Sequence, residues 1–296
     1  MVRAARWPSP KTSSRQTDID RKAALARILS EAESGELVFS THAEVALRVR
    51  LALEDPQLHL DDVARLVQAE PLLATRVVAL ANSVAFNRST QTIGDVKSAV
   101  AIVGVQLVRL LATALIMRQM VGEAATERQR QLAQGLWQHC AQIAALAHVL
   151  AHRLTTQAPD LALFGGMVHE IGGFYLIARA KDYPQLLEAA DAADDGGIDA
   201  DRLSQGVLRV LQVPAPLVAA ISGLAQARLA LPPDSLEQIL FLAHHLSPVA
   251  NPLLAGVAPD ADSLELTRLV NADARLAVLL AESQRELRSL TDALQL

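Results

Sequence analysis

Eight histidines are the residues of this sequence best suited to chemistry. The chain has no Gly-rich phosphate loop, no Gly-x-Ser-x-Gly nucleophile turn and no paired-cysteine metal motif. Imidazoles and carboxylates both bind transition metals, and a hydrolytic metal site needs several of them to converge with one position left open for water. The sequence therefore raises one chemical question, which is whether enough of these groups meet to hold a metal ion.

Two pairs of histidines lie close together in the sequence. His148 and His152 are one helical turn apart, a spacing that suits two ligands on one helix face. No glutamate separates them and no third donor is evident nearby, so the spacing favours a surface pair over a metal site. His244 and His245 would point about 100° apart on a helix, so we do not expect both to reach one ion.

The elements that must position these side chains are predicted to be helices. Hydrophobic residues make up 51% of the 296 residues and aromatic residues only 3%, so Ala, Leu, Val and Ile must build the core. Ala and Leu are strong helix formers. Helical spacing dominates from Asp18 onward and no segment predicts a strand. We expect an all-α protein, a two-lobed bundle with helices over 18–35, 40–54, 63–68, 72–81, 95–104, 105–120, 128–154, 159–169, 199–211, 214–224 and 235–246, another from 172, and a last one within 263–296.

The chain divides into an arm, a main domain and a tail. Residues 1–17 predict a disordered basic arm, because prolines and serines there prevent regular structure. The helix over 18–35 would pack on the main domain, 36–251, and residues 252–296 would form a C-terminal helical tail. The last helix could pack back on the bundle or pair with another copy, which leaves a homodimer open.

Two polar stretches interrupt the helical pattern inside the main domain. The stretch between Gly122 and Gln129 is the clearest internal boundary and would separate two helical halves. Residues 191–197, with the sequence DAADDGG, predict a flexible surface loop.

Charge and cysteine content limit the partners and the cellular compartment that we expect for the protein. The net charge of −5 argues against a nucleic-acid binder, although residues 1–30 hold seven basic residues against two aspartates. The single cysteine, Cys140, excludes an internal disulfide and fits a reducing compartment. No apolar run reaches the roughly 20 residues that a membrane span needs, and the N-terminus lacks a secretory signal. We expect a cytoplasmic protein without a membrane partner.

Four segments in succession resemble the HDOD domain family. Residues 70–83, EPLLATRVVALANS, are similar to its acidic-Pro pair, short apolar helix and terminal Asn-Ser. Residues 93–104 and 107–115 resemble the two helices that follow, and 136–139 (LWQH) and 164–172 (FGGMVHEIG) resemble its later elements. The resemblance implies an all-helical, HD-like domain of bacterial signalling proteins, related to HD-type metal phosphohydrolases but generally without their metal ligands. It also implies that no receiver, sensor or cyclic-dinucleotide enzyme domain is attached here, so that partners bind in trans.

The resemblance also places the candidate metal ligands. HD enzymes use a histidine on one helix, an adjacent His-Asp pair on another and a later aspartate. These positions fall on His139, on His169 with Glu170, and on His244 of this chain. Glutamate therefore replaces one aspartate and histidine replaces the other.

The family resemblance, together with the two missing aspartates, implies a non-catalytic signal-transduction domain that acts by protein–protein interaction, with no catalytic residue and no cofactor. A small ligand in the vestigial cleft could add to this role. The main alternative is a residual metal-dependent phosphohydrolase or phosphodiesterase of HD type, with a divalent transition metal on His139, His169, Glu170 and His244. A third hypothesis, contact with DNA or RNA through the basic arm, is the least favoured by the charge.

Overall fold

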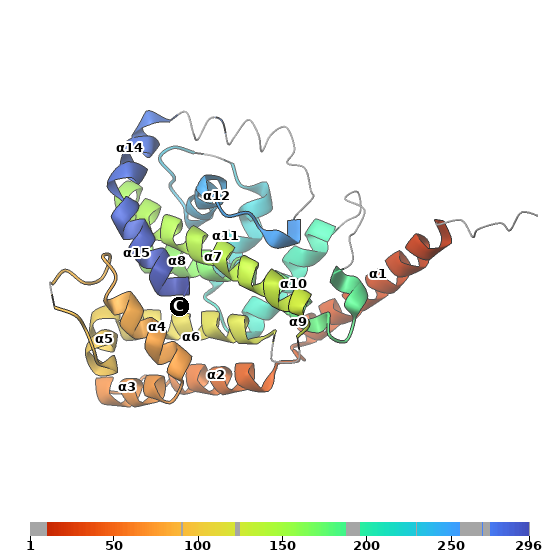
Figure 1. Ribbon diagram of the computed structural model, residues 1–296, viewed down its shortest axis with the longest axis horizontal. Helices are drawn as coiled ribbons and strands as arrows, with labels where there is room; N and C mark the ends of the chain where they lie inside the picture. Colours follow the sequence, from red (N-terminus) through yellow and green to blue (C-terminus); the bar gives the residue numbers. More distant parts are fainter. Residues whose placement is uncertain are drawn as a thin grey trace, which may run out of the picture.

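The expected all-α fold class is confirmed. This computed structural model describes residues 11–89, 91–121, 125–187, 196–228, 230–254, 268 and 273–295, and these residues form helices and no strand. Apart from the first and last helices, the helices fall into two groups that follow one another along the chain, which are the two lobes of the bundle (Figure 1). The polar boundary predicted between Gly122 and Gln129 separates them, since one helix ends at Gln119 and the next begins at Glu127.

The first lobe consists of five helices whose ends follow local signals. The side chain of Ser40 accepts a hydrogen bond from the backbone N–H of Ala43, and Asp95 caps a later helix through the N–H of Ser98. Gly104 has φ 86°, a conformation that favours glycine, and the chain bends there by 105°. The helices are α2 (Thr41–Ala52), α3 (Leu60–Gln68), α4 (Pro71–Ala81), α5 (Val96–Val103) and α6 (Val105–Gln119).

The second lobe is built around one long helix, α7 (Glu127–Leu154). Its most extensive contact is with α8 (Pro159–Val168), and Gly166 permits the close approach, because a Cβ atom there would lie 2.4 Å from the Cα of Ala144. The few aromatic residues concentrate here: Phe164, Phe174 and Tyr175 are fully buried. The other elements are α9 (Ile171–Arg179), η1 (Pro184–Leu187), α10 (Gly196–Val210), α11 (Ala215–Gly223), η2 (Leu224–Gln226), α12 (Leu236–Leu246) and η3 (Pro252–Leu254).

The helix α1 (Lys11–Ser34) begins seven residues earlier than the predicted start at Asp18. Residues 11–17, which were expected in the disordered arm, are helical because no proline or glycine follows Pro10 until Gly35. Residues 1–10 of the predicted arm lie outside the described residues. The helix packs on α10 and η1, and Glu31 forms an ion pair with the buried Arg179.

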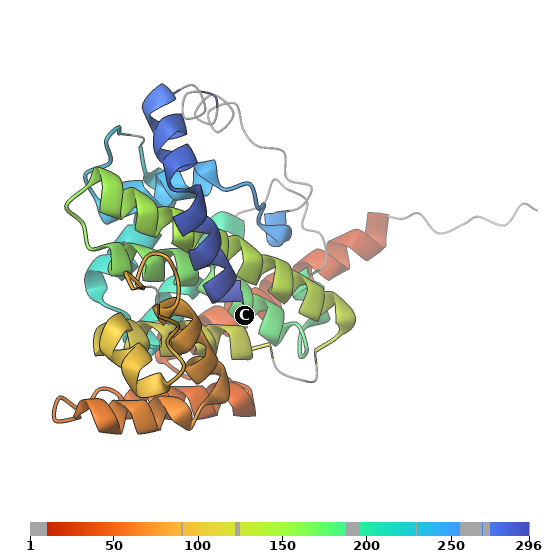
Figure 2. The same cartoon turned by 60° about the vertical axis from the view of Figure 1, so that its left-hand side comes forward.

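Among the described residues of the C-terminal tail, two α-helices take the place of the predicted single one. They are α14 (Ala274–Glu282) and α15 (Gln284–Gln295), and Ser283 separates them. The helix α15 packs back on the bundle against α7 and α4, so it bridges the two lobes (Figure 2). Most of the predicted loop at 191–197 lies outside the described residues, although its two glycines begin α10.

In the described part of the chain, one segment is by itself long and apolar enough to cross a membrane. Among the described residues, the segment Pro159–Arg179, which spans α8 and α9, passes a test of length and composition, contrary to the expectation that no apolar run is long enough. The helices α5 and α6 pass it together only as a pair bent by 105°. However, 72% of the apolar window in Pro159–Arg179 is buried inside the fold. We therefore interpret α8 and α9 as core helices.

Candidate functional site

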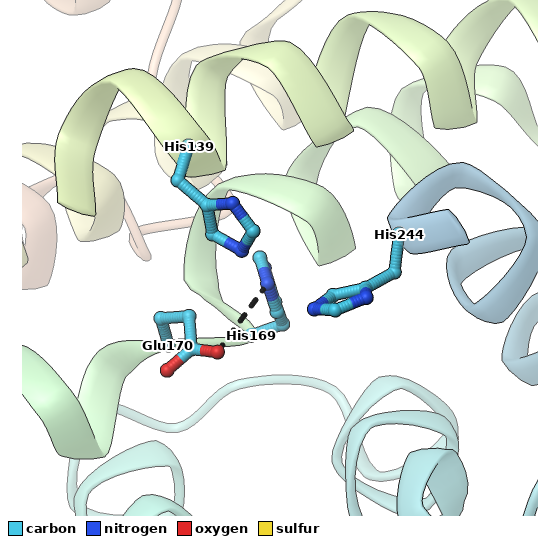
Figure 3. Close-up of side chains that lie close together, drawn as sticks. All are labelled: His139, His169, Glu170 and His244. Atoms are coloured by element: carbon cyan, nitrogen blue, oxygen red, sulfur yellow. Dashed lines mark ion pairs between the residues drawn. The ribbon is translucent and has the colours of Figure 1, made fainter. Parts of the chain in front are cut away.

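The structure brings all four predicted ligands together. His139 lies in the middle of α7, His169 follows the last residue of α8, and Glu170 precedes α9. His244 lies in the last turn of α12 (Figure 3). Each of these four residues offers one ligand atom, and the four ligand atoms all lie within 4.8 Å of one another. Three elements distant in the sequence thus form one cluster, which we call the His3Glu cluster.

Backbone carbonyls fix the orientation of two of the imidazoles. The Nδ1–H of His139 donates to the carbonyl of Val249 at 2.7 Å, and the Nδ1–H of His169 donates to the carbonyl of Gly166 at 2.8 Å. A carbonyl can only accept, so the proton of each neutral ring must be on Nδ1. The Nε2 atoms of both rings then carry free lone pairs. Both Nε2 atoms are buried and have no hydrogen-bond partner.

The electrostatics keep these imidazoles neutral. Burial, followed by the nearby His139 and His244, holds the pKa of His169 well below its usual value. Burial also lowers the pKa of His139, and burial together with His139 and His245 lowers that of His244 to about 4. Neutral imidazole is the form that binds a metal. At neutral pH the cluster therefore presents three nitrogen donors.

Glu170 supplies the fourth donor. One of its carboxylate oxygens lies 3.7 Å from the Nε2 of His169. Burial raises the pKa of Glu170 to about 7, although a hydrogen bond from Asn251 opposes this rise. A cation beside Glu170 would stabilise its charged form.

Two residues near the cluster were missed by the sequence analysis. Asn251 is buried, hydrogen-bonds Glu170 and accepts a hydrogen bond from the backbone N–H of Leu253 at 2.9 Å. Asp201, on α10, lies close enough for its charge to raise the pKa of Glu170. No motif marks either residue, because α10 and the chain after α12 meet α9 only in the folded protein.

The His3Glu cluster fits a single transition-metal ion. Three imidazoles and one carboxylate match the donors that Zn²⁺, Fe²⁺ or Ni²⁺ use in proteins. Hydrogen bonds from the second ring nitrogen to backbone carbonyls are typical of metal-binding histidines. Two buried Nε2 atoms without a partner are costly unless a ligand satisfies them. Within the described ranges, no other His, Cys, Asp or Glu belongs to this group of donors.

The other histidine pair differs from its prediction. His148 does not lie on the surface: it is buried, and its ring nitrogens lie 3.8 Å from Glu286 and 4.0 Å from Asp160. The reason is that α15 packs over α7 at this point, which helical spacing alone could not reveal. His152 is exposed, as predicted.

Lowering the pH from about 7 to 5 should destabilise the protein through His148. Burial, and then the charge of His152, lower the pKa of His148 from 6.5 to about 4. Between these values the unfolded chain binds a proton that the folded chain does not, so stability falls as the pH falls. The loss is about 2 kcal/mol at most by pH 5. Guanidinium unfolding at both pH values should show a smaller loss for His148→Leu than for the wild type, and equal losses would contradict this prediction.

Comparison with known proteins identifies the family and the fold. The HDOD domain family matches residues 39–211, more than half of the chain and within the predicted range 36–251. A structure from Shewanella amazonensis SB2B, named "Putative metal-dependent phosphohydrolase", has a TM-score of 0.68 at 17% identity and covers 93% of this chain and 99% of its own. An HDOD domain protein of unknown function from Geobacter sulfurreducens has a TM-score of 0.53 at 18% identity, with coverage of 92% and 97%.

A third structure, from Marinobacter aquaeolei VT8, is named "Putative signal transduction protein". It has a TM-score of 0.54 at 17% identity, and the match covers 94% of this chain and 66% of that one. No curated protein sequence matches the chain. These identities are low, so the structural matches support the HD-like fold and leave the activity open. The match over 39–211, together with this fold, shows that the chain belongs to the HDOD domain family.

Proposed function

We propose that this protein is a non-catalytic regulatory domain that binds one divalent transition-metal ion in its His3Glu cluster and signals through a protein partner in trans. The regulatory role is supported by membership of the HDOD family and by a structural neighbour named as a signal transduction protein. The metal is the alternative that the sequence left open, and the geometry of the cluster favours it.

One observation supports the proposed metal binding. The Nε2 atoms of His139 and His169 are buried, without a hydrogen-bond partner, and face the same space as Glu170 and His244 (Figure 3). A merely vestigial site would be expected to pair these atoms or to replace the residues with apolar ones, because an unsatisfied buried polar atom costs about 1–3 kcal/mol. A metal ion would satisfy all four groups together.

The same donor set argues against hydrolysis. When bound, the ion would act as a Lewis acid and lower the pKa of any water in an open position. Glu170 would be held in place by Asn251, and His139 and His169 by backbone carbonyls. However, the two aspartates that the HD resemblance requires are a glutamate and a histidine here. We therefore assign the ion a structural or sensory role.

The experiment is metal analysis of untagged protein purified without chelator. We expect about one equivalent of Zn, Fe, Mn, Co or Ni per chain, or uptake of one equivalent after the metal-free protein is soaked with each ion. At 100 times the dissociation constant, the ion should stabilise the fold by about 2.7 kcal/mol. The melting temperature should then rise by roughly 5–10 °C.

A parallel assay tests the non-catalytic half. The loaded protein should hydrolyse bis(p-nitrophenyl) phosphate and nucleoside monophosphates no faster than buffer that contains the same ion. No metal on purification and none after soaking would refute the metal half. Turnover that disappears in the variant His169→Ala would instead establish the residual phosphohydrolase, which the names of two structural neighbours favour.

A further inference from the structure

A partly buried cationic site lies where α15 ends against the seam between the two lobes. Arg76 of α4 and Arg118 of α6 both have their guanidinium groups over the indole of Trp137, on α7, at 4.9 Å and 5.3 Å from its centroid. Arg76 and the indole N–H of Trp137 both donate to the backbone carbonyl of Leu294. The last turn of α15 thus occupies a site that both lobes build.

This site suits the C-terminal end of a helix. The last carbonyls of a helix have no partner within it and carry a partial negative charge, which cations stabilise. Arg76 is only 3% exposed, and its Nε and Nη2 atoms still have no hydrogen-bond partner. Since an arginine stays charged when it is buried, the site retains donors that α15 does not use. The seam can therefore bind more carbonyl or carboxylate groups than α15 offers.

The rest of α15 follows a simple amphipathic pattern. Leu290, Ala293 and Leu294 are buried against the bundle, and Glu286 lies one turn earlier beside His148 and Arg153. Ser289 accepts a hydrogen bond from the backbone N–H of Val84 at 3.0 Å. The docked helix is thus held by one short apolar stripe, an acidic residue near its start and its carbonyl end.

The helix α15 depends little on the elements next to it in the sequence. Its main contacts with other helices are with α7, α4 and α14, and Ser289 also bonds to Val84 in the loop after α4. The preceding helix α14 has one buried residue, Leu276, and Val278 is 58% exposed. An open cavity of about 580 Å³ lies between α14 and Arg153, at the start of α15. Release of α15 would therefore disturb few other contacts of the described residues.

We propose that the surface of α4 and α7 under α15, which we call the seam groove, is a docking site for an amphipathic helix of a partner protein, and that α15 covers it in the free protein. This inference specifies how the protein partner of the proposed function would bind, and it rests on that proposed function. The contacts of α15 define the partner helix. It has apolar residues at positions i, i+3 and i+4, an acidic residue one turn before them, and a C-terminal end whose free backbone carbonyls meet Arg76.

The test uses the full chain and a synthetic peptide of residues 284–295 as the partner helix. Trp7→Phe leaves Trp137 as the only tryptophan and so makes it a reporter of the groove. In that background, Leu290→Asp should release α15, shift the emission of Trp137 to the red and raise deuterium uptake in 284–295 but not in α7 and α8. The labelled peptide should then bind at least about 10-fold more tightly than to the chain with Leu290, because its own α15 no longer competes.

Controls separate docking from general damage. Leu72→Asp is a matched control, because Leu72 lies on α4 and is exposed. Adding Arg76→Met to Leu290→Asp should weaken peptide binding about 10-fold, and a peptide of scrambled sequence should not bind. Equal binding of the peptide to both chains, equal binding of the scrambled peptide or an unchanged α15 in Leu290→Asp would overturn the proposal.

If Leu290→Asp does not fold, hydrogen exchange of the unmodified chain tests whether α15 opens independently of the bundle. Residues 284–295 should exchange through an opening at least about 10-fold more frequent than the one that exposes α7 and α8. Exchange of α15 only with the whole protein would refute the inference. Metal content is measured separately, so failure of the metal site and failure of the groove give different results.

Discussion

His169→Ala should abolish stoichiometric metal binding, with less than about 0.1 equivalent retained and an affinity at least about 100-fold lower. Loss of an outer partner of a metal ligand already costs about 10–100-fold in affinity, so loss of a ligand should cost more. His169 is the central residue, because it lies beside both His139 and Glu170 and is itself buried. The measurements are metal analysis of the purified variant and calorimetric titration of its metal-free form.

His245→Ala is the matched control for this prediction. His245 is adjacent to His244, but its ring packs on Phe241 at 4.4 Å and its Nδ1–H donates to the carbonyl of Phe241. It contributes nothing to the group of four donors. We expect this variant to bind metal within about threefold of the wild type. Equal loss in both variants would mean that the ion binds elsewhere.

Gly166→Ala should destabilise the protein by about 3 kcal/mol or more. The new Cβ atom would lie 2.4 Å from the Cα and 2.5 Å from the backbone N of Ala144. Backbone atoms cannot rotate away, so α8 and α7 would have to separate, and overpacking of this kind costs roughly 1–3 kcal/mol or more. The gain in helix propensity from glycine to alanine, about 1 kcal/mol, is too small to compensate.

The same substitution should also weaken metal binding. The carbonyl of Gly166 orients the ring of His169, and the separation of α8 from α7 would move that ring away from His139. Because the overpacked helices destabilise the fold, thermal unfolding of the metal-free variant should show a midpoint lower by roughly 5–10 °C. Metal titration should show a lower affinity.

Gly94→Ala serves as the control for the glycine substitution. A Cβ atom at Gly94 would have nothing within 4 Å. We expect a change within about 0.5 kcal/mol, as for other surface substitutions. If Gly166→Ala were equally harmless, the close contact of α7 and α8 would not be the constraint that we infer.

The sequence determined most of the fold, because the signals that end its helices are local. Asp95 and Gly104 mark the ends of α5, and Pro71 marks the start of α4. The helix positions follow from such signals and from apolar spacing, so they could be predicted before any tertiary contact was known. The start of α1 at Lys11 was missed because Pro8 and Pro10, together with Ser13 and Ser14 inside the helix, suggested a longer irregular arm.

The sequence also supplied the four residues of the His3Glu cluster, although only through the family resemblance. It could not show that their donor atoms converge, because that depends on how α7, α8 and α12 pack together. It placed His148 on the surface, since nothing in the spacing of α7 shows that α15 covers this residue. Local signals thus set the helices, whereas only the packing of distant segments decided which polar side chains are buried, which lie together and which lack a partner.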